Sequence, residues 1–250
     1  KYFRKNNFDY VIHLAAQAGV RYSIENPQTY LKNNIIGFFN VLNLSKELNV
    51  KHLLFASTSS VYGNSTNFPL KEKEDTSLPL SFYAATKKSN EVMAHSYSNI
   101  FKLPCTALRF FTVYGPYGRP DMALYKFVKA ISKSEEMNVF NYGKHTRDFT
   151  YISDVVDAIE KLILKSPKKE IPYDVFNIGG GNPQTLKKYI STIEKKVKKR
   201  SKIKYLRLQL GDIIKTHADI SRIKRRIGYK PKVNILQGIS NFVDWYNERK

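Results

Sequence analysis

The sequence of 250 residues contains very little cysteine and no long hydrophobic run. Its single cysteine, Cys105, has no second cysteine for a disulfide bond, and it lies in an apolar run, where buried thiols are usually inert. A transmembrane helix needs about 18 or more consecutive apolar residues, and no such stretch occurs. The first residues also lack the apolar core of a secretory leader. We therefore expect no membrane insertion and a cytoplasmic location.

Acidic residues are also scarce, because 21 Asp and Glu stand against 42 Lys and Arg, which gives a formal net charge of +21. A charge of this sign can indicate binding to nucleic acid or to an anionic membrane surface. However, the basic residues are spread over every segment, and the densest run, 195–204, ends a helical pattern. We interpret that run as a solvated helix end and expect no nucleic-acid partner. The excess positive charge would still attract an anionic substrate.

Short apolar runs alternate with longer amphipathic patterns along the chain. The short runs predict strands at 9–14, 52–57, 106–111, 149–152 and 175–178. The longer patterns predict helices at 30–49, 83–101, 122–134, 153–165, 186–199 and 235–249. This alternation favours an α/β fold with a doubly wound, mostly parallel sheet. Ligands bind such sheets beyond the carboxyl ends of the strands, which is where the polar segments 15–23, 58–63 and 112–118 lie.

A dinucleotide-binding sheet of this kind normally opens with a glycine-rich turn, and the chain has none. The expected pattern is G-x-G-x-x-G or G-x-x-G-x-x-G between the first strand and the first helix. The only glycine cluster, 179–181, does not continue in that pattern and predicts an ordinary turn. Because the chain also begins at a lysine, we interpret it as the carboxyl-terminal part of a longer protein, without its first two or three βα units.

A hydroxyl, a phenol and an ammonium group are spaced for acid–base chemistry. Thr58 follows the second predicted strand, and Tyr83 precedes Lys87 by four residues at the start of a helix that Ser81 is predicted to cap. Residues four apart share a helix face, so Lys87 should lie beside Tyr83 and lower the pKa of its phenol from about 10. Such a group can remove a proton from an alcohol while a hydride leaves. The Tyr-x-x-x-Lys spacing alone is weak, because it occurs by chance in many helices.

Several further sequence blocks strengthen this interpretation. They are 13–23, 30–37, 109–123, 147–152, 176–179, 211–212, 218–219 and 228–231. In order and spacing they resemble, along essentially the whole chain, the extended short-chain dehydrogenase/reductases that act on nucleotide sugars. Within that family the chain looks most like the UDP-glucuronate 4-epimerases. It departs from them at 209–214, where Gln-Leu-Gly-Asp-Ile-Ile replaces a segment of the Gln-Pro-Gly-Asp-Val-Pro type.

The resemblance implies a Rossmann-like sheet, truncated at its amino-terminal side, with a smaller carboxyl-terminal lobe that binds the substrate. Residues 1–115 would be the remaining part of an NAD-binding domain, and 148–180 would return to that domain. Residues 116–147 and 181–250 would form the lobe for the nucleotide sugar.

The resemblance also implies a homodimer. In this family the helix that bears the tyrosine and the lysine joins a four-helix interface between two subunits. The same helix of this chain carries an apolar stripe at helical spacing, although such a stripe belongs more often to a core. The stripe consists of Met93, Ala94, Tyr97, Ile100 and Phe101.

The implied reaction is a 4-epimerisation of a UDP-sugar with NAD as cofactor, and its catalytic residues would be Thr58, Tyr83 and Lys87. Tyr83 would take the proton from the C4 hydroxyl while C4 passes a hydride to NAD⁺, and the hydride would return to the opposite face of the 4-keto intermediate. Thr58 would bind the same oxygen. Lys87 would hold the cofactor ribose and keep Tyr83 ionised.

Further contacts are implied by the same resemblance. Cofactor-binding residues would be Ala15, Ala16, Asn34, Ser57, Tyr83, Lys87 and Phe110. Substrate-binding residues would be Arg21, Thr58, Thr112, Arg119, Arg147 and Asp212. Arg119 and Arg147 would clamp anionic groups, because a guanidinium donates in a rigid fork. The alternative for each arginine is a surface salt bridge. His13 and His52 are predicted to be core residues, and nothing resembles a metal site.

Three alternatives stay open. A UDP-galactose-type epimerase or a nucleotide-sugar dehydratase would use the same catalytic residues. Dehydratases usually carry Asp-Glu after the catalytic Thr, whereas Ser59 and Ser60 follow Thr58 here, which favours an epimerase. The third alternative is an inactive fragment or a complementing subunit. The 250-residue chain alone should bind NAD poorly, because the pyrophosphate of NAD binds N–H groups at the start of the helix behind the first strand.

Overall fold

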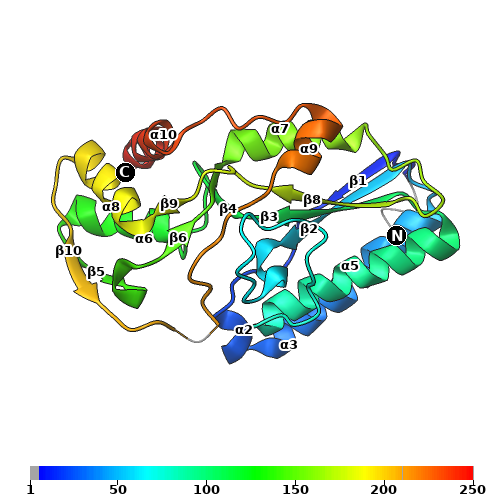
Figure 1. Ribbon diagram of the computed structural model, residues 1–250, viewed down its shortest axis with the longest axis horizontal. Coiled ribbons are helices and arrows are strands. Elements are labelled where there is room, and N and C mark those ends of the chain that lie inside the picture. The colour runs from blue at the N-terminus through cyan, green and yellow to red at the C-terminus, as the bar shows by residue number, and fades with distance from the viewer. Residues whose placement is uncertain (1–5, 210, 250) are drawn as a thin grey trace.

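A four-stranded parallel sheet forms the centre of the structure, a computed structural model in which residues 6–209 and 211–249 are described. The strands lie in the order β1 (Tyr10–His13), β2 (His52–Thr58), β3 (Cys105–Phe110) and β8 (Tyr173–Ile178) (Figure 1). Every neighbouring pair of these strands is parallel. The predicted fold class, an α/β fold with a parallel Rossmann-like sheet, is therefore confirmed.

Helices cover both faces of this sheet, which explains why the central strands are continuous apolar runs. Because side chains alternate along a strand, Leu53 and Phe55 point to one face and Leu54 to the other. The first face packs against α4 (Gly37–Glu47) and α5 (Phe82–Phe101). The second packs against α7 (Ile152–Ile163) and α9 (Ser221–Ile227), which lie on the opposite side of the sheet in Figure 1.

The segment predicted as one helix at 30–49 is interrupted. After α2 (Tyr22–Glu25), the chain forms α3 (Pro27–Tyr30), a π-helix η1 (Leu31–Ile36) and then α4. Asn34 lies inside the π-helix with 1% of its surface exposed, and its side-chain amide bonds to the segment that follows β1. A single π-helical turn widens the helix and often occurs at a functional site. The predicted helix at 30–49 is therefore present, but it opens with a π-helical turn that the sequence did not indicate.

The predicted strand at 149–152 does not join the central sheet. It forms β7 (Phe149–Tyr151), which pairs in parallel with β4 (Thr112–Tyr114) beyond the carboxyl edge of β3. The carboxylate of Asp148 accepts hydrogen bonds from the N–H groups of Gly180, Gly181 and Ala218. These bonds hold the start of β7 at the turn that follows β8. Because that turn lies beyond the carboxyl edge of the central sheet, β7 lies outside the sheet.

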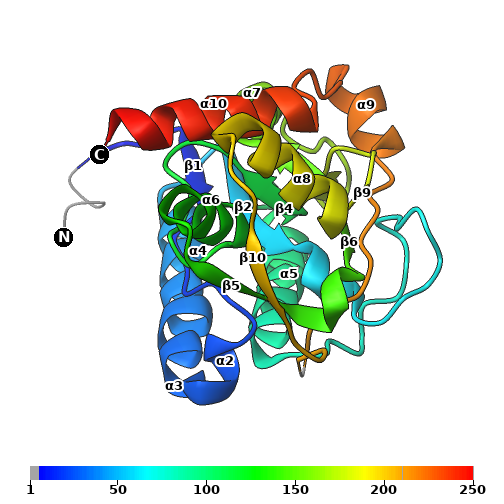
Figure 2. The same cartoon turned by 90° about the vertical axis from the view of Figure 1, so that its left-hand side faces the viewer.

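A second group of elements packs around its own hydrophobic core beyond this edge. It contains α6 (Ala123–Lys133), β5 (Glu136–Val139), α8 (Leu186–Val197), β10 (Lys202–Tyr205) and α10 (Ile235–Glu248). Shorter elements connect them, namely η3 (Phe140–Gly143), β6 (Thr146–Arg147) and β9 (Gln184–Thr185). Figure 2 shows this lobe from the front, with the parallel strands β5 and β10 side by side.

The predicted division into a cofactor domain and a substrate lobe stays a prediction. The segment 148–180 supplies β8 to the central sheet, while most of 116–147 and 181–250 lies in the second group of elements. Residues 1–5, 210 and 250 of the predicted domains are outside the described residues. Within the described part, no helix is long and apolar enough to cross a membrane.

Candidate active site

The predicted catalytic residues come together at the carboxyl edge of the sheet, between β2 and α5. Thr58 ends β2 and caps the short helix η2 (Ser59–Tyr62). Its Oγ1 accepts a hydrogen bond from the backbone N–H of Ser60 at 3.2 Å and donates one to the Ser60 hydroxyl at 3.2 Å. At the start of α5, the Ser81 hydroxyl accepts a hydrogen bond from the N–H of Ala84 at 3.2 Å, which confirms Ser81 as the helix cap.

Tyr83 lies in the first turn of α5, where its phenol is close to the Thr58 hydroxyl. Burial raises the pKa of Tyr83, and the neighbouring Thr58 hydroxyl and the positive charge of Arg119 partly oppose that shift. The expectation that Lys87 lowers the pKa of Tyr83 was therefore wrong for this structure. Desolvation of the phenol dominates, and the lysine directs its ammonium group elsewhere.

Lys87 is buried with 2% of its surface exposed. Its Nζ donates a hydrogen bond to the carbonyl of Ala56 on β2 at 2.9 Å. Burial lowers the pKa of Lys87 to about 8. Among the described residues this carbonyl is the one acceptor recorded for Nζ, so the remaining N–H donors can bind a ligand. A buried ammonium group with spare donors is costly unless a ligand uses them.

Asn34 shapes the segment that follows β1. Its Oδ1 accepts a hydrogen bond from the N–H of Gln17 at 2.8 Å, and its Nδ2 donates to the carbonyl of Gln17 and to the Thr86 hydroxyl, both at 3.0 Å. These bonds engage both ends of the amide with the protein. The predicted direct contact between Asn34 and the cofactor stays a prediction, whereas its contact with the segment after β1 is a feature of the structure.

The other residues predicted to bind the cofactor differ from one another in exposure and in their contacts. Ala15 and Ala16 are exposed in the segment after β1. Phe110 is half-buried at the end of β3 and packs on the cluster beneath α7. The hydroxyl of Ser57 is buried and donates to the carboxylate of Glu91 at 2.6 Å. This bond uses the one proton of the Ser57 hydroxyl, and the predicted contact between Ser57 and the cofactor stays a prediction.

These residues fit one end of NAD. Lys87 offers buried donors suited to the hydroxyl groups of a ribose, and Ala15 and Ala16 are exposed just after β1, the strand that pairs with β2. The cluster Gly179–Gly181 does not act as a phosphate turn, because two of its N–H groups bind the carboxylate of Asp148. The prediction of an ordinary turn is therefore confirmed. No glycine-rich turn of the dinucleotide-binding type occurs in the described part of the chain.

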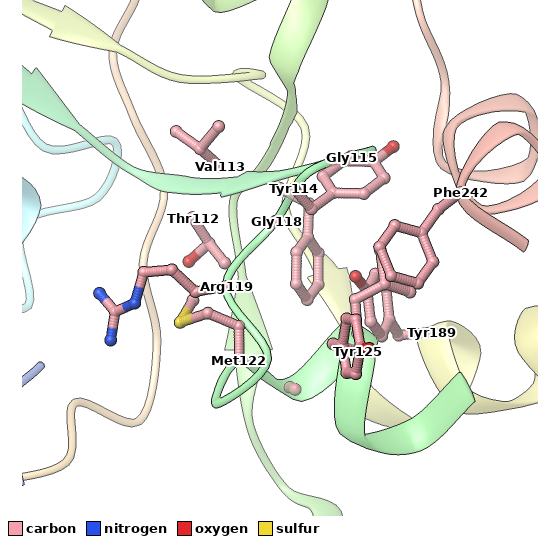
Figure 3. Close-up of a pocket in the computed structure, with 13 residues that line it drawn as sticks. Thr112, Val113, Tyr114, Gly115, Gly118, Arg119, Met122, Tyr125, Tyr189 and Phe242 are labelled. Atoms are coloured by element: carbon pink, nitrogen blue, oxygen red, sulfur yellow. The ribbon is translucent and has the colours of Figure 1, made fainter. Parts of the chain in front are cut away.

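Arg119 lies near Tyr83, the predicted catalytic tyrosine. Its Nη2 is 3.5 Å from the position that a Cβ at Gly19 would occupy, and its charge acts on the phenol of Tyr83. Nε donates to the carboxylate of Asp121 at 2.9 Å. In Figure 3 the guanidinium points away from the aromatic side chains of the lobe, while Thr112 lies near the start of the same strand-to-helix segment. A cavity of about 50 Å³ is lined by this segment.

A second group of charged side chains contains Arg21, Arg147 and Asp212. Arg21 forms an ion pair with Asp212 at 3.1 Å. Arg147 donates instead to the backbone carbonyl of Ile214 at 2.8 Å. Burial lowers the pKa of Arg147 to about 10, against the opposing charge of Asp212. Arg21 and Arg119 therefore form salt bridges with protein carboxylates, as the alternative prediction had it. Among the described residues, no carboxylate lies within ion-pair distance of Arg147.

The sequence did not predict a role for His145, which precedes this group. His145 is 7% exposed, and its Nε2 has no hydrogen-bond partner among the described residues. Burial and the nearby Arg147 lower its pKa. By contrast, the prediction for His52 is confirmed, because its two ring nitrogens contact the carbonyl of Ile163 and the hydroxyl of Thr106 inside the core.

Sequence reasoning also missed the buried pair of Glu91 and Arg109. Glu91 follows Tyr83 and Lys87 at the same spacing of four residues, so all three share one face of α5. That spacing was the available signal for Glu91, and no such signal pointed to Arg109. Another cavity, of about 290 Å³, lies apart from these residues and is lined by residues such as Thr150, Asp154 and Lys188.

Comparison with known proteins agrees with the geometry of the site. Residues 1–179 match the NAD dependent epimerase/dehydratase family. Protein CapI of Staphylococcus aureus is 48% identical over 262 residues, which cover 99% of this chain and 78% of CapI. A probable UDP-glucuronate 4-epimerase of Rhizobium meliloti is 44% identical over 253 residues, which cover 95% of this chain and 74% of that protein.

A solved structure shows the same fold. The UDP-glucuronic acid 4-epimerase of Bacillus cereus, in complex with UDP-glucuronic acid and NAD, superposes with a TM-score of 0.91 at 36% identity. The match covers 97% of this chain and 76% of that one. These similarities confirm the predicted resemblance, enzyme class and cofactor: the chain belongs to the NAD dependent epimerase/dehydratase family.

Proposed function

We propose that the protein inverts C4 of UDP-glucuronate to give UDP-galacturonate. The observation that carries this proposal is the placement of Tyr83, in the first turn of α5, close to Thr58 at the end of β2, with the positive charge of Arg119 near the phenol. The Rhizobium relative and the Bacillus structure, both named for UDP-glucuronate or UDP-glucuronic acid, support the choice of sugar.

The side chains of the site would divide the acid–base work between them. NAD, when bound, supplies the acceptor and donor of hydride. Tyr83 would remove the proton from the C4 hydroxyl and later return it, while Thr58 binds the same oxygen. Because burial raises the pKa of Tyr83, the ionised phenol needs compensation, which the neighbouring Thr58 hydroxyl and the charge of Arg119 would provide. Lys87 would hold the ribose through its spare N–H donors.

The two groups of arginines would hold the two ends of the substrate. Arg119 lies near Tyr83, so it would bind the sugar carboxylate after exchanging its partner Asp121 for the substrate. Arg147 carries a desolvated charge, and among the described residues no carboxylate lies at ion-pair distance from it. An anionic diphosphate would therefore stabilise the charged guanidinium by pairing with it. Arg21, Asp212 and Thr112 would complete the pocket.

We also propose that two copies of the chain associate through α4 and α5. Of the apolar stripe predicted on α5, Ala94 is core, and Met93 and Tyr97 pack against the core. The large apolar residues that do lie exposed on these helices are Phe39, Phe82, Val92, Ile100 and Phe101. Sedimentation of the protein and of a Val92→Lys/Ile100→Lys variant tests this proposal, since only the unaltered protein should sediment as a dimer.

The substrate proposal is tested by comparing UDP-glucuronate with UDP-glucose. We expect kcat/KM to be higher for UDP-glucuronate, and we expect Arg119→Met to reduce that preference, because the variant cannot hold a carboxylate. Arg222→Met serves as the control, since Arg222 binds Asp174 outside this site. If UDP-glucose is turned over faster than UDP-glucuronate by the unaltered protein, the assignment of a uronic acid is wrong.

A further inference from the structure

Glu91 and Arg109 form a buried ion pair directly behind the catalytic residues. Their side chains are 3% and 4% exposed, and the contact is bidentate: Nε donates to Oε1 at 2.9 Å and Nη2 to Oε2 at 2.8 Å. Burial alone would raise the pKa of Glu91, but the hydrogen bonds and charge of Arg109, with the hydroxyl of Ser57, leave it lowered. The pair is therefore charged, and its two partners are held in one fixed geometry.

This pair joins the elements that carry Thr58 and Tyr83. Glu91 lies on α5, and it accepts a hydrogen bond from Ser57, the residue before Thr58, at 2.6 Å. Arg109 lies on β3, where Ser57 is its register partner on β2. One carboxylate therefore connects α5, β2 and β3 at the level of the site.

Arg109 also fixes the turn that follows Thr58. Its guanidinium carbon lies 4.8 Å from the centre of the Tyr62 ring in η2. The hydroxyl of Tyr62 donates to Asn177 on β8 at 2.6 Å, and Nη1 of Arg109 donates to the carbonyl of Glu72 at 3.1 Å. The strand before Thr58 and the turn after it thus depend on the same guanidinium.

We propose that the Glu91–Arg109 pair positions the catalytic residues by locking the end of β2 and the turn η2 against α5. Neither side chain touches the site, so both act through Ser57 and Tyr62 on the separation of the Thr58 hydroxyl and the Tyr83 phenol. An active site loses rate when its reacting groups are held only slightly out of place. The proposal rests on the proposed function, in which these two hydroxyl groups bind the same substrate oxygen.

The test uses the protein as its gene encodes it and the double variant Glu91→Met/Arg109→Met. Replacing both members of a buried ion pair by apolar residues of similar volume often leaves stability unchanged. We expect the melting temperature to be preserved, kcat to fall about a hundredfold and KM for UDP-glucuronate to change little, since the lost interaction acts on the reacting geometry. Arg109→Lys should recover part of the rate, because it keeps the charge but not the fork.

The matched control is Asp174→Met/Arg222→Met, which removes the Arg–Asp contact at 2.7 Å near the other end of β8. This control should keep kcat. The proposal is overturned if the folded Glu91→Met/Arg109→Met protein keeps kcat within about threefold, or if the control loses as much as the double variant does. Should the double variant fail to fold, Ser57→Ala removes one hydrogen bond and leaves the ion pair. A rate for Ser57→Ala equal to that of the unaltered protein then overturns the proposal, and a loss of about tenfold supports it.

Amide hydrogen exchange separates this proposal from the proposed function. Exchange at residues 57–62 and 81–87 should be faster in the double variant than in the unaltered protein, and it should be unchanged in the Asp174→Met/Arg222→Met control. If the unaltered protein turns over no UDP-sugar, the proposed function fails, and the exchange rates alone decide the positioning role. Equal exchange in all three proteins would rule that role out.

Discussion

At the scale of single residues, the proposed chemistry would depend on the phenol of Tyr83, whose pKa is raised, and on the ammonium group of Lys87, whose pKa is lowered. Burial is the first cause in both, because each charged form loses hydration. The residue spacing identified Tyr83 and Lys87, but it could not show that Lys87 donates to the carbonyl of Ala56. That contact depends on the approach of α5 to β2, which is a tertiary property.

Tyr83→Phe should lower kcat by at least about a hundredfold, the usual contribution of a general acid–base group. The phenylalanine keeps the ring but cannot accept the proton of the C4 hydroxyl. Steady-state rates with UDP-glucuronate measure the loss. Tyr97→Phe is the matched control on the same helix, because Tyr97 packs on the core and should leave the rate unchanged. Equal rates for Tyr83→Phe and the unaltered protein would remove Tyr83 from the mechanism.

Lys87→Met should stabilise the fold at neutral pH while abolishing turnover. A lowering of the pKa of Lys87 from 10.5 to about 8 corresponds to a destabilisation of roughly 3 kcal/mol, at about 1.4 kcal/mol per pKa unit. The unfolded state binds more protons between these two pH values, so the unaltered protein gains stability as pH rises from 8 towards 10.5.

Urea denaturation at several pH values measures this difference. The stability advantage of Lys87→Met should be largest below about pH 8 and should shrink above it. An advantage that is independent of pH would show that Lys87 is not desolvated as described.

At the scale of elements, the first turn of α5 determines where Tyr83 lies, and Ser81 holds that turn. Ser81→Ala removes the cap and should cost about 1 kcal/mol of stability. It should also lower kcat, because the tyrosine lies in the released turn. Asn234→Ala removes the corresponding cap of α10, where Asn234 accepts from Gln237 at 3.0 Å, and should cost similar stability with kcat unchanged. Denaturation and steady-state rates of both variants are compared. An equal kcat for both would show that the Ser81 cap does not affect the position of Tyr83.

Local patterns predicted most of these elements, and long-range contacts explain the exceptions. The apolar runs at β2 and β3 and the cap at Ser81 depend on neighbouring residues, so the sequence was sufficient for them. The π-helix around Asn34 was not predictable, because its bonds reach Gln17 and Thr86. The position of β7 likewise follows from bonds between Asp148 and the distant turn after β8.

The same distinction holds for the candidate site. The Tyr-x-x-x-Lys spacing is local, and it led to Tyr83 and Lys87, the residues proposed to be catalytic. Arg109 and Glu91 are separated by 18 residues along the chain and are joined only when α5 packs on β3, so no local pattern identifies their contact. The unpartnered nitrogen of His145 is also visible only in the folded structure.

At the scale of the whole molecule, an apolar sheet edge coexists with a large positive charge. Among the described residues β1 has a strand partner on one side only, and Tyr10, Ile12 and Leu14 beside that edge are 40%, 45% and 50% exposed. Exposed edges of this kind pair with other chains, whereas the net charge of +21 keeps copies of the molecule apart.

The 250-residue chain should therefore aggregate as salt is added, because ions screen the repulsion between copies. Light scattering between roughly 0.05 and 1 M NaCl measures this effect. Ile12→Lys should suppress the aggregation, whereas Leu164→Lys, which alters an exposed residue at the end of α7, should not. Aggregation that is equal in both variants would place the association elsewhere on the surface.

The central claim is that the protein inverts C4 of a UDP-sugar by reversible oxidation with NAD. The most direct measurement follows UDP-glucuronate labelled with deuterium at C4. The account predicts UDP-galacturonate that keeps the deuterium at C4 with no net consumption of NAD, because a transferred hydride does not exchange with water. Loss of the label to solvent, or an unchanged configuration at C4, would contradict the account.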